Sequence, residues 1–279
     1  MGSEPTDERA TPRSEARDLT LTWLGQAGFR LDAGADHVLI DPFFSPHPAR
    51  AYDPEPGAPL TTGSSAIFCT HEHEDHFDAP LLRQLGAAGE RPAVVVPAPV
   101  LPIAAAAGIP TDQLLGARPG ETLHLGGTAA HPVAAWHGLG GDLPVSYGLR
   151  TAADRDDAVR FLGYVIEIGG WRVYHSGDTL AYPGMVERLR ELAVDVMLVP
   201  INGRDFMREQ AGCVGNLDAA EAAWLCAAVR ARLAIPMHYD AMSDNLGDVG
   251  GFVRAIVDTH APVTVLAPPR WHPVRLPSA

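Results

Sequence analysis

The chain has 279 residues, 46% of them hydrophobic, so it can bury the core of one large domain or of two small ones. Its net charge of -13 opposes binding to polyanions, because nucleic-acid recognition needs a basic surface that displaces phosphate counterions. All 21 basic residues are arginines, which excludes a Schiff-base lysine, a P-loop lysine and a Ser-Lys dyad.

The cysteines and the N-terminal segment bear on the cell compartment. Cys69, Cys213 and Cys226 are scattered and form no C-x-x-C pair, so we expect reduced thiols. No apolar run approaches the roughly 20 residues that span a bilayer, and residues 1–17 lack the apolar core of a signal peptide. We therefore expect a cytoplasmic protein with no membrane partner, and the composition leaves a homo-oligomer open.

Residues 1–17 are polar and show no apolar periodicity, which predicts a disordered tail before a single domain at residues 18–279. Short strands broken by glycine turns open that domain, and a Pro- and Gly-rich surface loop follows them. These strands are predicted at 19–25, 29–34 and 37–42, and the loop runs to residue 63.

The rest of the chain alternates strand and helix patterns. Strands are predicted at 66–70, 93–96, 122–125, 128–136, 194–200 and 233–236, and helices at 79–86, 102–108, 217–230 and 249–257. The segment 163–178 repeats the pattern of 28–41, which is strand, glycine turn, strand and aspartate. The sequence therefore predicts an α/β fold of two β-rich halves, with helices outside two sheets.

A short polar loop, H-E-H-E-D-H at 71–76, directly follows a predicted buried strand. In an extended or turning loop, His71 and His73 can converge on one metal ion, while Asp75 and His76 can serve a second ion. A zinc or manganese ion needs further ligands from distant segments. His137, Asp178 and His238 each come where a loop leaves a strand, so they are the candidates.

The H-E-H-E-D-H motif resembles the H-x-H-x-D-H signature of the metallo-β-lactamase superfamily, and the three distal residues follow in that superfamily's order. The resemblance covers Leu19 to about residue 270 and implies an αββα four-layer sandwich. The segments W-L-G-Q-A-G-F, I-D-P-F, Y-H-S-G-D-T, G-N-L-D-A-A-E-A and I-P-M-H-Y-D look like the branch that includes L-ascorbate 6-phosphate lactonase.

The resemblance also implies a division of ligands. His71, His73 and His137 would hold one ion, Asp75, His76 and His238 the other, and Asp178 would bridge the two ions. A metal-bound hydroxide would then attack a small, anionic ester, lactone or phosphodiester, with Asp75 as the general acid or base. Zinc and manganese are the favoured metals, iron is acceptable to the same ligands, and one ion or two remain open.

Two other functions stay open. A nuclease of the same superfamily would act on nucleic acid, although the acidic charge disfavours it. A non-catalytic protein of the same fold would keep the ligands for metal binding or sensing.

Contacts to a substrate are sought in the polar segment 201–216 and beside His238. Arg204 is a candidate to hold an anionic group, or else forms a structural salt bridge with a neighbour such as Asp205. Asn216 is a second candidate, or else caps the following helix. Tyr239 is a third, as an oxyanion donor or as a packing residue.

The remaining polar residues are assigned structural places. Glu72 and Glu74 occupy the variable positions of the signature and are predicted to face away from the ions. Asp78 is predicted to cap the helix that begins at Ala79. His131 falls within a strand and is disfavoured against His137, while His175 either orients a ligand or fills its strand.

Overall fold

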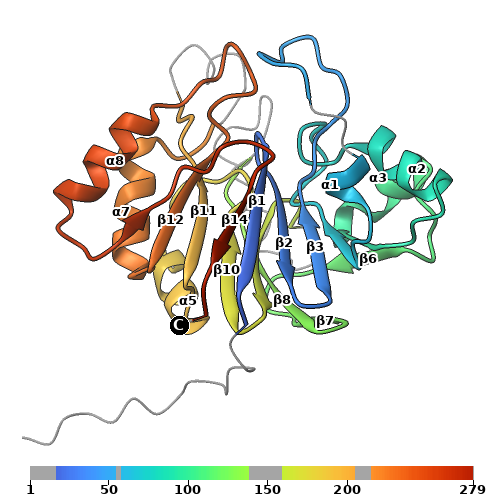
Figure 1. Ribbon diagram of the computed structural model, residues 1–279, viewed down its shortest axis with the longest axis horizontal. Helices are drawn as coiled ribbons and strands as arrows, with labels where there is room; N and C mark the ends of the chain where they lie inside the picture. Colours follow the sequence, from blue (N-terminus) through green and yellow to red (C-terminus); the bar gives the residue numbers. More distant parts are fainter. Residues whose placement is uncertain (1–16, 55–57, 138–158, 205–214, 279) are drawn as a thin grey trace, which may run out of the picture.

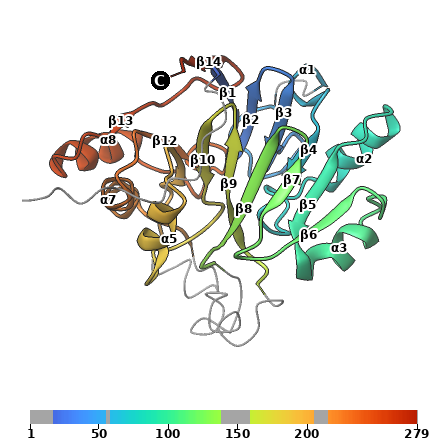
Figure 2. The same cartoon turned by 90° about the horizontal axis from the view of Figure 1, so that it is seen from below.

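Two mixed β-sheets face each other, and helices cover the outer face of each sheet (Figure 1, Figure 2). The computed structural model describes residues 17–54, 58–137, 159–204 and 215–278. The predicted αββα sandwich of two β-rich halves is confirmed. Apart from Arg17, the predicted tail at residues 1–17 lies outside the described residues, as does Cys213.

The N-terminal sheet has the strand order β14-β1-β2-β3-β4-β5-β6. Its strands are β1 (Leu19–Gly25), β2 (Gly28–Ala33), β3 (Asp36–Ile40), β4 (Ala66–Phe68), β5 (Ala93–Pro97), β6 (Leu114–Ala117) and β14 (Pro273–Leu276). Strands β1 to β3, which the sequence predicted as short strands broken by glycine turns, form an antiparallel meander, whereas β3 to β6 run parallel. The meander pairs Leu21 with Leu31 and Trp23 with Phe29, and all four side chains are buried between the sheets.

The C-terminal sheet has the order β13-β12-β11-β10-β9-β8-β7. Its strands are β7 (Leu123–Leu125), β8 (Thr128–Ala134), β9 (Leu162–Ile168), β10 (Trp171–His175), β11 (Val196–Pro200), β12 (Leu233–Met237) and β13 (Thr264–Val265). It too begins antiparallel, from β7 to β10, and continues parallel. The predicted repeat is therefore the hairpin β2–β3 and its counterpart β9–β10, and Asp41 and Asp178 follow equivalent hairpins.

The helices lie in two groups, one on each side of the sandwich (Figure 1). One group consists of α1 (Ala58–Thr61), α2 (Ala79–Ala87) and α3 (Leu101–Ala106), and the 3₁₀ turn η1 (Ala98–Val100) directly precedes α3. The other group consists of α5 (Met185–Glu191), α7 (Ala219–Val229) and α8 (Val249–Asp258). Phe252 and Ile256, four residues apart on α8, are buried against α7 and the C-terminal sheet. None of the described helices is long and apolar enough to span a bilayer.

Two helix caps test the sequence predictions. Asp78 caps α2 as predicted, because its carboxylate accepts a hydrogen bond from Leu81 N at 2.9 Å. The predicted cap at Asn216 is wrong, since Asp218 caps α7 instead. Asp218 and Glu221 form a capping box, in which each side chain accepts a backbone N–H of the other residue. This reciprocal pair satisfies two N–H groups at once, which a cap at Asn216 would leave unbonded.

Candidate metal centre

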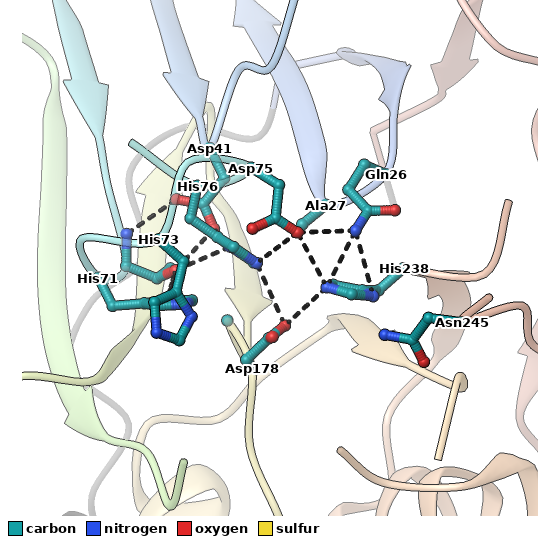
Figure 3. A network of polar contacts seen from close by, with 12 residues as sticks. Gln26, Ala27, Asp41, His71, His73, Asp75, His76, Asp178, His238 and Asn245 are labelled. Carbon is teal, nitrogen blue, oxygen red and sulfur yellow. Dashed lines mark hydrogen bonds and ion pairs between the residues drawn. The ribbon is translucent and has the colours of Figure 1, made fainter. Parts of the chain in front are cut away.

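Every candidate ligand follows the end of a β-strand. The loop 71–76 follows β4, while His137, Asp178 and His238 follow β8, β10 and β12. The side chains meet at one end of the sandwich. Figure 3 shows the six of them that it labels, which are His71, His73, Asp75, His76, Asp178 and His238. The side chains form three overlapping groups, and within each group the possible ligand atoms lie within 4.8 Å of one another. The groups are His71, His73 and His137; His71, His76 and Asp178; and Asp75, His76 and His238. The structure thus brings together all the side chains that the sequence predicted as ligands.

The three-histidine site consists of His71, His73 and His137. His71 Nε2 lies 2.8 Å from His73 Nδ1. His137 Nδ1 lies 3.2 Å from the carbonyl oxygen of Gly215, which can only accept, so this nitrogen carries the hydrogen and Nε2 is left for a ligand. Burial lowers the pKa of all three histidines, to about 4 for His73. They are therefore neutral imidazoles at pH 7, the form that binds metal.

The mixed site consists of Asp75, His76 and His238. Asp75 Oδ2 lies 3.3 Å from His238 Nε2 and 3.5 Å from His76 Nε2. Burial opposes the charged form of His238, but the Asp178 and Asp75 carboxylates outweigh it and raise its pKa to about 9. For the same reason the pKa of His76 lies well above its usual value, and these histidines lower the pKa of Asp75 despite its burial. The mixed site thus concentrates negative charge that needs a cation or protons to balance it.

Asp178 lies between the two sites. Its Oδ2 is 3.5 Å from His137 Nε2, whereas its Oδ1 is 3.3 Å from the Nε2 atoms of both His76 and His238. Both Asp178 Oδ1 and His76 Nε2 are buried, and apart from these ion pairs neither atom has a hydrogen-bond partner. Buried polar atoms are rarely left unsatisfied in this way, and two of them facing each other from a His/Asp set fit a divalent metal ion.

Comparison with known proteins agrees with this geometry. The family described as "Beta-lactamase superfamily domain" matches residues 36–239 of this chain, a range that includes every candidate ligand. A UPF0173 metal-dependent hydrolase from Opitutus terrae is 30% identical over 255 residues, which cover 90% of this chain and 97% of the relative. This chain belongs to the UPF0173 family within the β-lactamase superfamily.

Solved structures share the fold at lower sequence identity. Igni18, a metallo hydrolase from Ignicoccus hospitalis, has a TM-score of 0.69 at 22% identity, covering 93% of this chain and 98% of its own. CmlA, a diiron β-hydroxylase from Streptomyces venezuelae, has a TM-score of 0.64 at 16% identity, covering 96% of this chain and 55% of its own. Such identities show the fold alone, and the fold does not set the reaction. The narrower resemblance to L-ascorbate 6-phosphate lactonase stays a prediction.

Asp41 supports two of the candidate ligands, and the sequence reasoning did not single it out. Its fully buried carboxylate accepts hydrogen bonds from Thr70 N at 2.8 Å, from Thr70 Oγ1 at 2.7 Å and from His76 Nδ1 at 2.7 Å. Because the Thr70 hydroxyl donates to Asp41, it accepts from His71 Nδ1 at 3.0 Å. Asp41 thereby directs the Nε2 atoms of His71 and His76 toward the cluster. The repeat that pairs Asp41 with Asp178 was the signal that could have identified it.

Gln26 is the second residue that the sequence reasoning missed. Its side-chain amide donates to Asp75 Oδ2 at 2.8 Å, and its Nε2 lies 3.0 Å from His238 Nε2 (Figure 3). The Gln26 carbonyl oxygen accepts the backbone N–H of His238 at 3.0 Å. Both residues have positive φ, 50° and 57°, so two tight bends face each other across the sandwich. Gln26 therefore fixes Asp75 and His238 relative to each other.

Arg204 is engaged in a structural ion pair. Its guanidinium donates to both carboxylate oxygens of Glu221, at 2.5 Å each, in a fork geometry. Glu221 also belongs to the capping box of α7, so this ion pair fastens residue 204 to the start of that helix. The salt-bridge interpretation is the one that these contacts favour, with Glu221 as the partner, while Asp205 lies outside the described residues.

Asn216 and Tyr239 lie near the centre in different ways. Asn216 is buried and donates to Asn202 Oδ1 at 3.1 Å, and Asn202 donates to Asn245 Oδ1 at 3.0 Å. This chain of amides joins the segment at Asn216 to the segment at Asn245, which follows His238 in the sequence. The Tyr239 ring packs on Trp23 with 4.9 Å between ring centroids, as the packing interpretation expects.

The other polar residues keep structural contacts. Glu72 accepts a hydrogen bond from Arg160, and the Glu74 side chain is 87% exposed, as predicted for spacers. His131, set aside on its position, lies 3.1 Å from Glu167 across the strand pair β8–β9. His175 Nε2 lies 2.7 Å from the Ala27 carbonyl oxygen, so it joins the end of β10 to the bend that contains Gln26.

We expect the two sites to differ in how metal affinity depends on pH. His238, with a pKa of about 9, is protonated at pH 7 in the ion-free protein and must lose that proton to bind metal, whereas the three histidines of the other site are already neutral. Affinity at the mixed site therefore rises with pH, by about tenfold per pH unit for each displaced proton, until about pH 9.

Calorimetric titration with Mn²⁺ between about pH 6 and pH 8, in buffers of different ionisation enthalpy, measures both the affinities and the protons released. Affinity at the three-histidine site should change little over the same range. Two affinities that rise equally with pH would contradict the assignment.

Proposed function

We propose that this chain is a metal-dependent hydrolase of small, anionic esters, lactones or phosphodiesters, working with one ion in the three-histidine site and a second in the mixed site. The position of Asp178 carries the proposal, because its two oxygens face the two sites separately. A carboxylate in that position is suited to hold two neighbouring cations. Zinc and manganese suit this donor set best.

Ions held there would supply Lewis-acid chemistry and bring the pKa of a coordinated water toward neutrality. The chain's own residues would do the rest. Asp41 and Gln26 hold their ligands rigidly, so little rearrangement is needed during a turnover. Asp75 is the carboxylate of the mixed site and is ionised at pH 7, so it can accept a proton during turnover.

Several observations support a small substrate over a polynucleotide. The chain carries a net charge of -13, which opposes binding to a phosphate backbone. Two divalent ions would exceed the charge of Asp75 and Asp178, so the centre itself would attract one anionic group. A non-catalytic metal-binding protein would use the same ligands, so only a measurement of turnover distinguishes it from a hydrolase.

The test combines metal analysis with a substrate panel. We expect up to two metal ions per chain by elemental analysis, and turnover of at least one neutral or anionic nitrophenyl ester, γ-lactone or bis(4-nitrophenyl) phosphate. A chelator should abolish that turnover, and added Mn²⁺ or Zn²⁺ should restore it. Full metal occupancy without turnover of any substrate would favour metal binding or sensing, and cleavage restricted to single-stranded DNA would favour the nuclease.

A further inference from the structure

The loop at residues 41–54, which follows β3, contacts both segments that supply the mixed site. At one end, Asp78 Oδ2 accepts the backbone N–H groups of Phe44 and Ser45 at 2.8 and 2.7 Å, which ties the loop to the residues that follow the H-E-H-E-D-H motif. At the other end, Ala51 N donates to Ala241 O at 2.7 Å, three residues beyond His238. The loop therefore connects the two segments that supply the mixed site, at the end of the sandwich where β3 finishes (Figure 1).

Arg50 is held within this loop by aromatic rings. Its guanidinium carbon lies 3.9 Å from the ring centroid of Phe43 and 5.5 Å from that of Tyr52, and its Nη2 donates to the Phe43 carbonyl oxygen at 3.1 Å. Its Nε is buried and has no hydrogen-bond partner. Across the described ranges, no carboxylate oxygen lies within 4.0 Å of this guanidinium. A half-buried cation with an unsatisfied N–H is costly unless an anion binds it.

The carboxylates near Arg50 are committed to other donors. Burial lowers the pKa of Arg50, and the nearby Tyr52, Asp78, Asp240 and Asp75 oppose that shift. Asp240 accepts from Arg270 at 2.8 Å, Asp78 accepts backbone N–H groups, and Asp75 belongs to the mixed site. None of the three is therefore the direct partner of Arg50.

We propose that Arg50 is the substrate-binding residue that receives the anionic end of the molecule hydrolysed at the adjacent metal centre. This inference rests on the proposed function. A guanidinium has five N–H donors in a planar arrangement that suits a carboxylate or a phosphate, and in Arg50 one of them is used by the Phe43 carbonyl oxygen while the ring contacts hold the group in place. Arg204, the other candidate, already places its fork on Glu221. Ions at the centre would offset the charge of Asp75, so an anion could approach Arg50 in the metal-loaded protein.

Two esters with the same leaving group test the inference on the metal-loaded protein. 4-Nitrophenyl hemisuccinate carries a free carboxylate, and 4-nitrophenyl acetate does not. In Arg50→Gln we expect KM for the hemisuccinate to rise about ten- to hundredfold, the range for a lost charge-assisted hydrogen bond, while kcat/KM for the acetate changes less than about twofold. Arg50→Lys keeps the charge but not the planar arrangement of donors, so its KM for the hemisuccinate should lie between those of the wild-type protein and Arg50→Gln.

Arg91→Gln is the matched control, because Arg91 is exposed, forms a surface pair with Asp112 and should leave both esters unaffected. Equal losses on both esters in Arg50→Gln, with thermal stability retained, would overturn the inference. If Arg50→Gln fails to fold, the two esters are compared in Arg50→Lys instead, and equal losses on both esters in that variant would overturn the inference.

Direct binding separates this inference from the proposed function. Inorganic phosphate and succinate are titrated calorimetrically into metal-loaded wild-type protein and Arg50→Gln, with no turnover required. A Kd that weakens about tenfold or more in the variant supports the inference even if no ester is hydrolysed, and the anion with the larger change identifies the preferred group. If each anion has the same Kd in wild-type protein and in Arg50→Gln, both anions bind the metal ions alone, and the inference about Arg50 is overturned.

Discussion

Replacing Asp75 by asparagine is expected to lower turnover by about a hundredfold to ten-thousandfold, the range for removing a group that transfers protons. Asparagine keeps the size of the side chain but cannot accept a proton, and its amide group would present N–H donors toward Gln26 or His238. The three-histidine site uses other residues and should keep its metal affinity. Steady-state kinetics with elemental analysis of the same sample measures both quantities.

Glu74→Gln is the matched control for this variant. Glu74 precedes Asp75 in the same loop, but its side chain is 87% exposed, so its removal should change neither kcat nor metal content. If the Asp75→Asn variant keeps both its metal and full activity, Asp75 is not the group that transfers protons. Loss of both ions would instead show that the two sites fill together.

The sequence predicted the candidate ligands because they are local to chain features that a pattern reveals. A dense His/Asp loop after a buried strand, and single residues at later strand ends, are visible without tertiary structure. Two sheets with helices outside followed from strand alternation and the repeated hairpins, since each hairpin is a local unit with its own turn, whereas the four-layer sandwich followed from the resemblance to the metallo-β-lactamase superfamily. Each of these signals is local, because the residues that form it lie within a few positions of one another in the chain.

The supporting residues could not be predicted because their partners are distant in sequence. Gln26 meets Asp75 across 49 positions, and Asp41 meets His76 across 35. Nothing in the neighbourhood of either residue specifies such a contact. The misplaced helix cap had a different cause, because the D-x-x-E pattern at Asp218 and Glu221 was present in the sequence and outweighs a nearer asparagine.

Arg204 and Arg50 show the same limit for charged side chains. In the sequence, Arg204 stands in a polar segment beside a predicted strand end, and only the structure shows that Glu221, 17 residues later, takes its fork. Arg50 stands in a loop rich in proline, and only the structure surrounds it with aromatic rings and leaves Nε unsatisfied. Which arginine is paired is therefore a property of the tertiary structure.

Asp41→Asn should weaken metal binding by about ten- to a hundredfold, the range for loss of a group that orients a metal ligand. The carboxylate accepts from a backbone N–H, a hydroxyl and an imidazole N–H, so either orientation of an asparagine amide would place its NH₂ against another donor. Asp41 has a φ of 45°, which asparagine tolerates well, so the backbone should not be strained. The variant therefore isolates the effect of the hydrogen bonds.

Asp195→Asn is the control for losing a buried carboxylate. Asp195 accepts the backbone N–H of Arg172 at 3.0 Å just before β11, whereas the ligands follow the other ends of their strands. Both variants should lose about 1–3 kcal/mol of unfolding free energy, as expected for a buried group left imperfectly bonded. Only Asp41→Asn should also weaken Mn²⁺ binding in calorimetry. Equal metal affinities in the two variants would mean that Asp41 stabilises the fold without orienting His71 and His76.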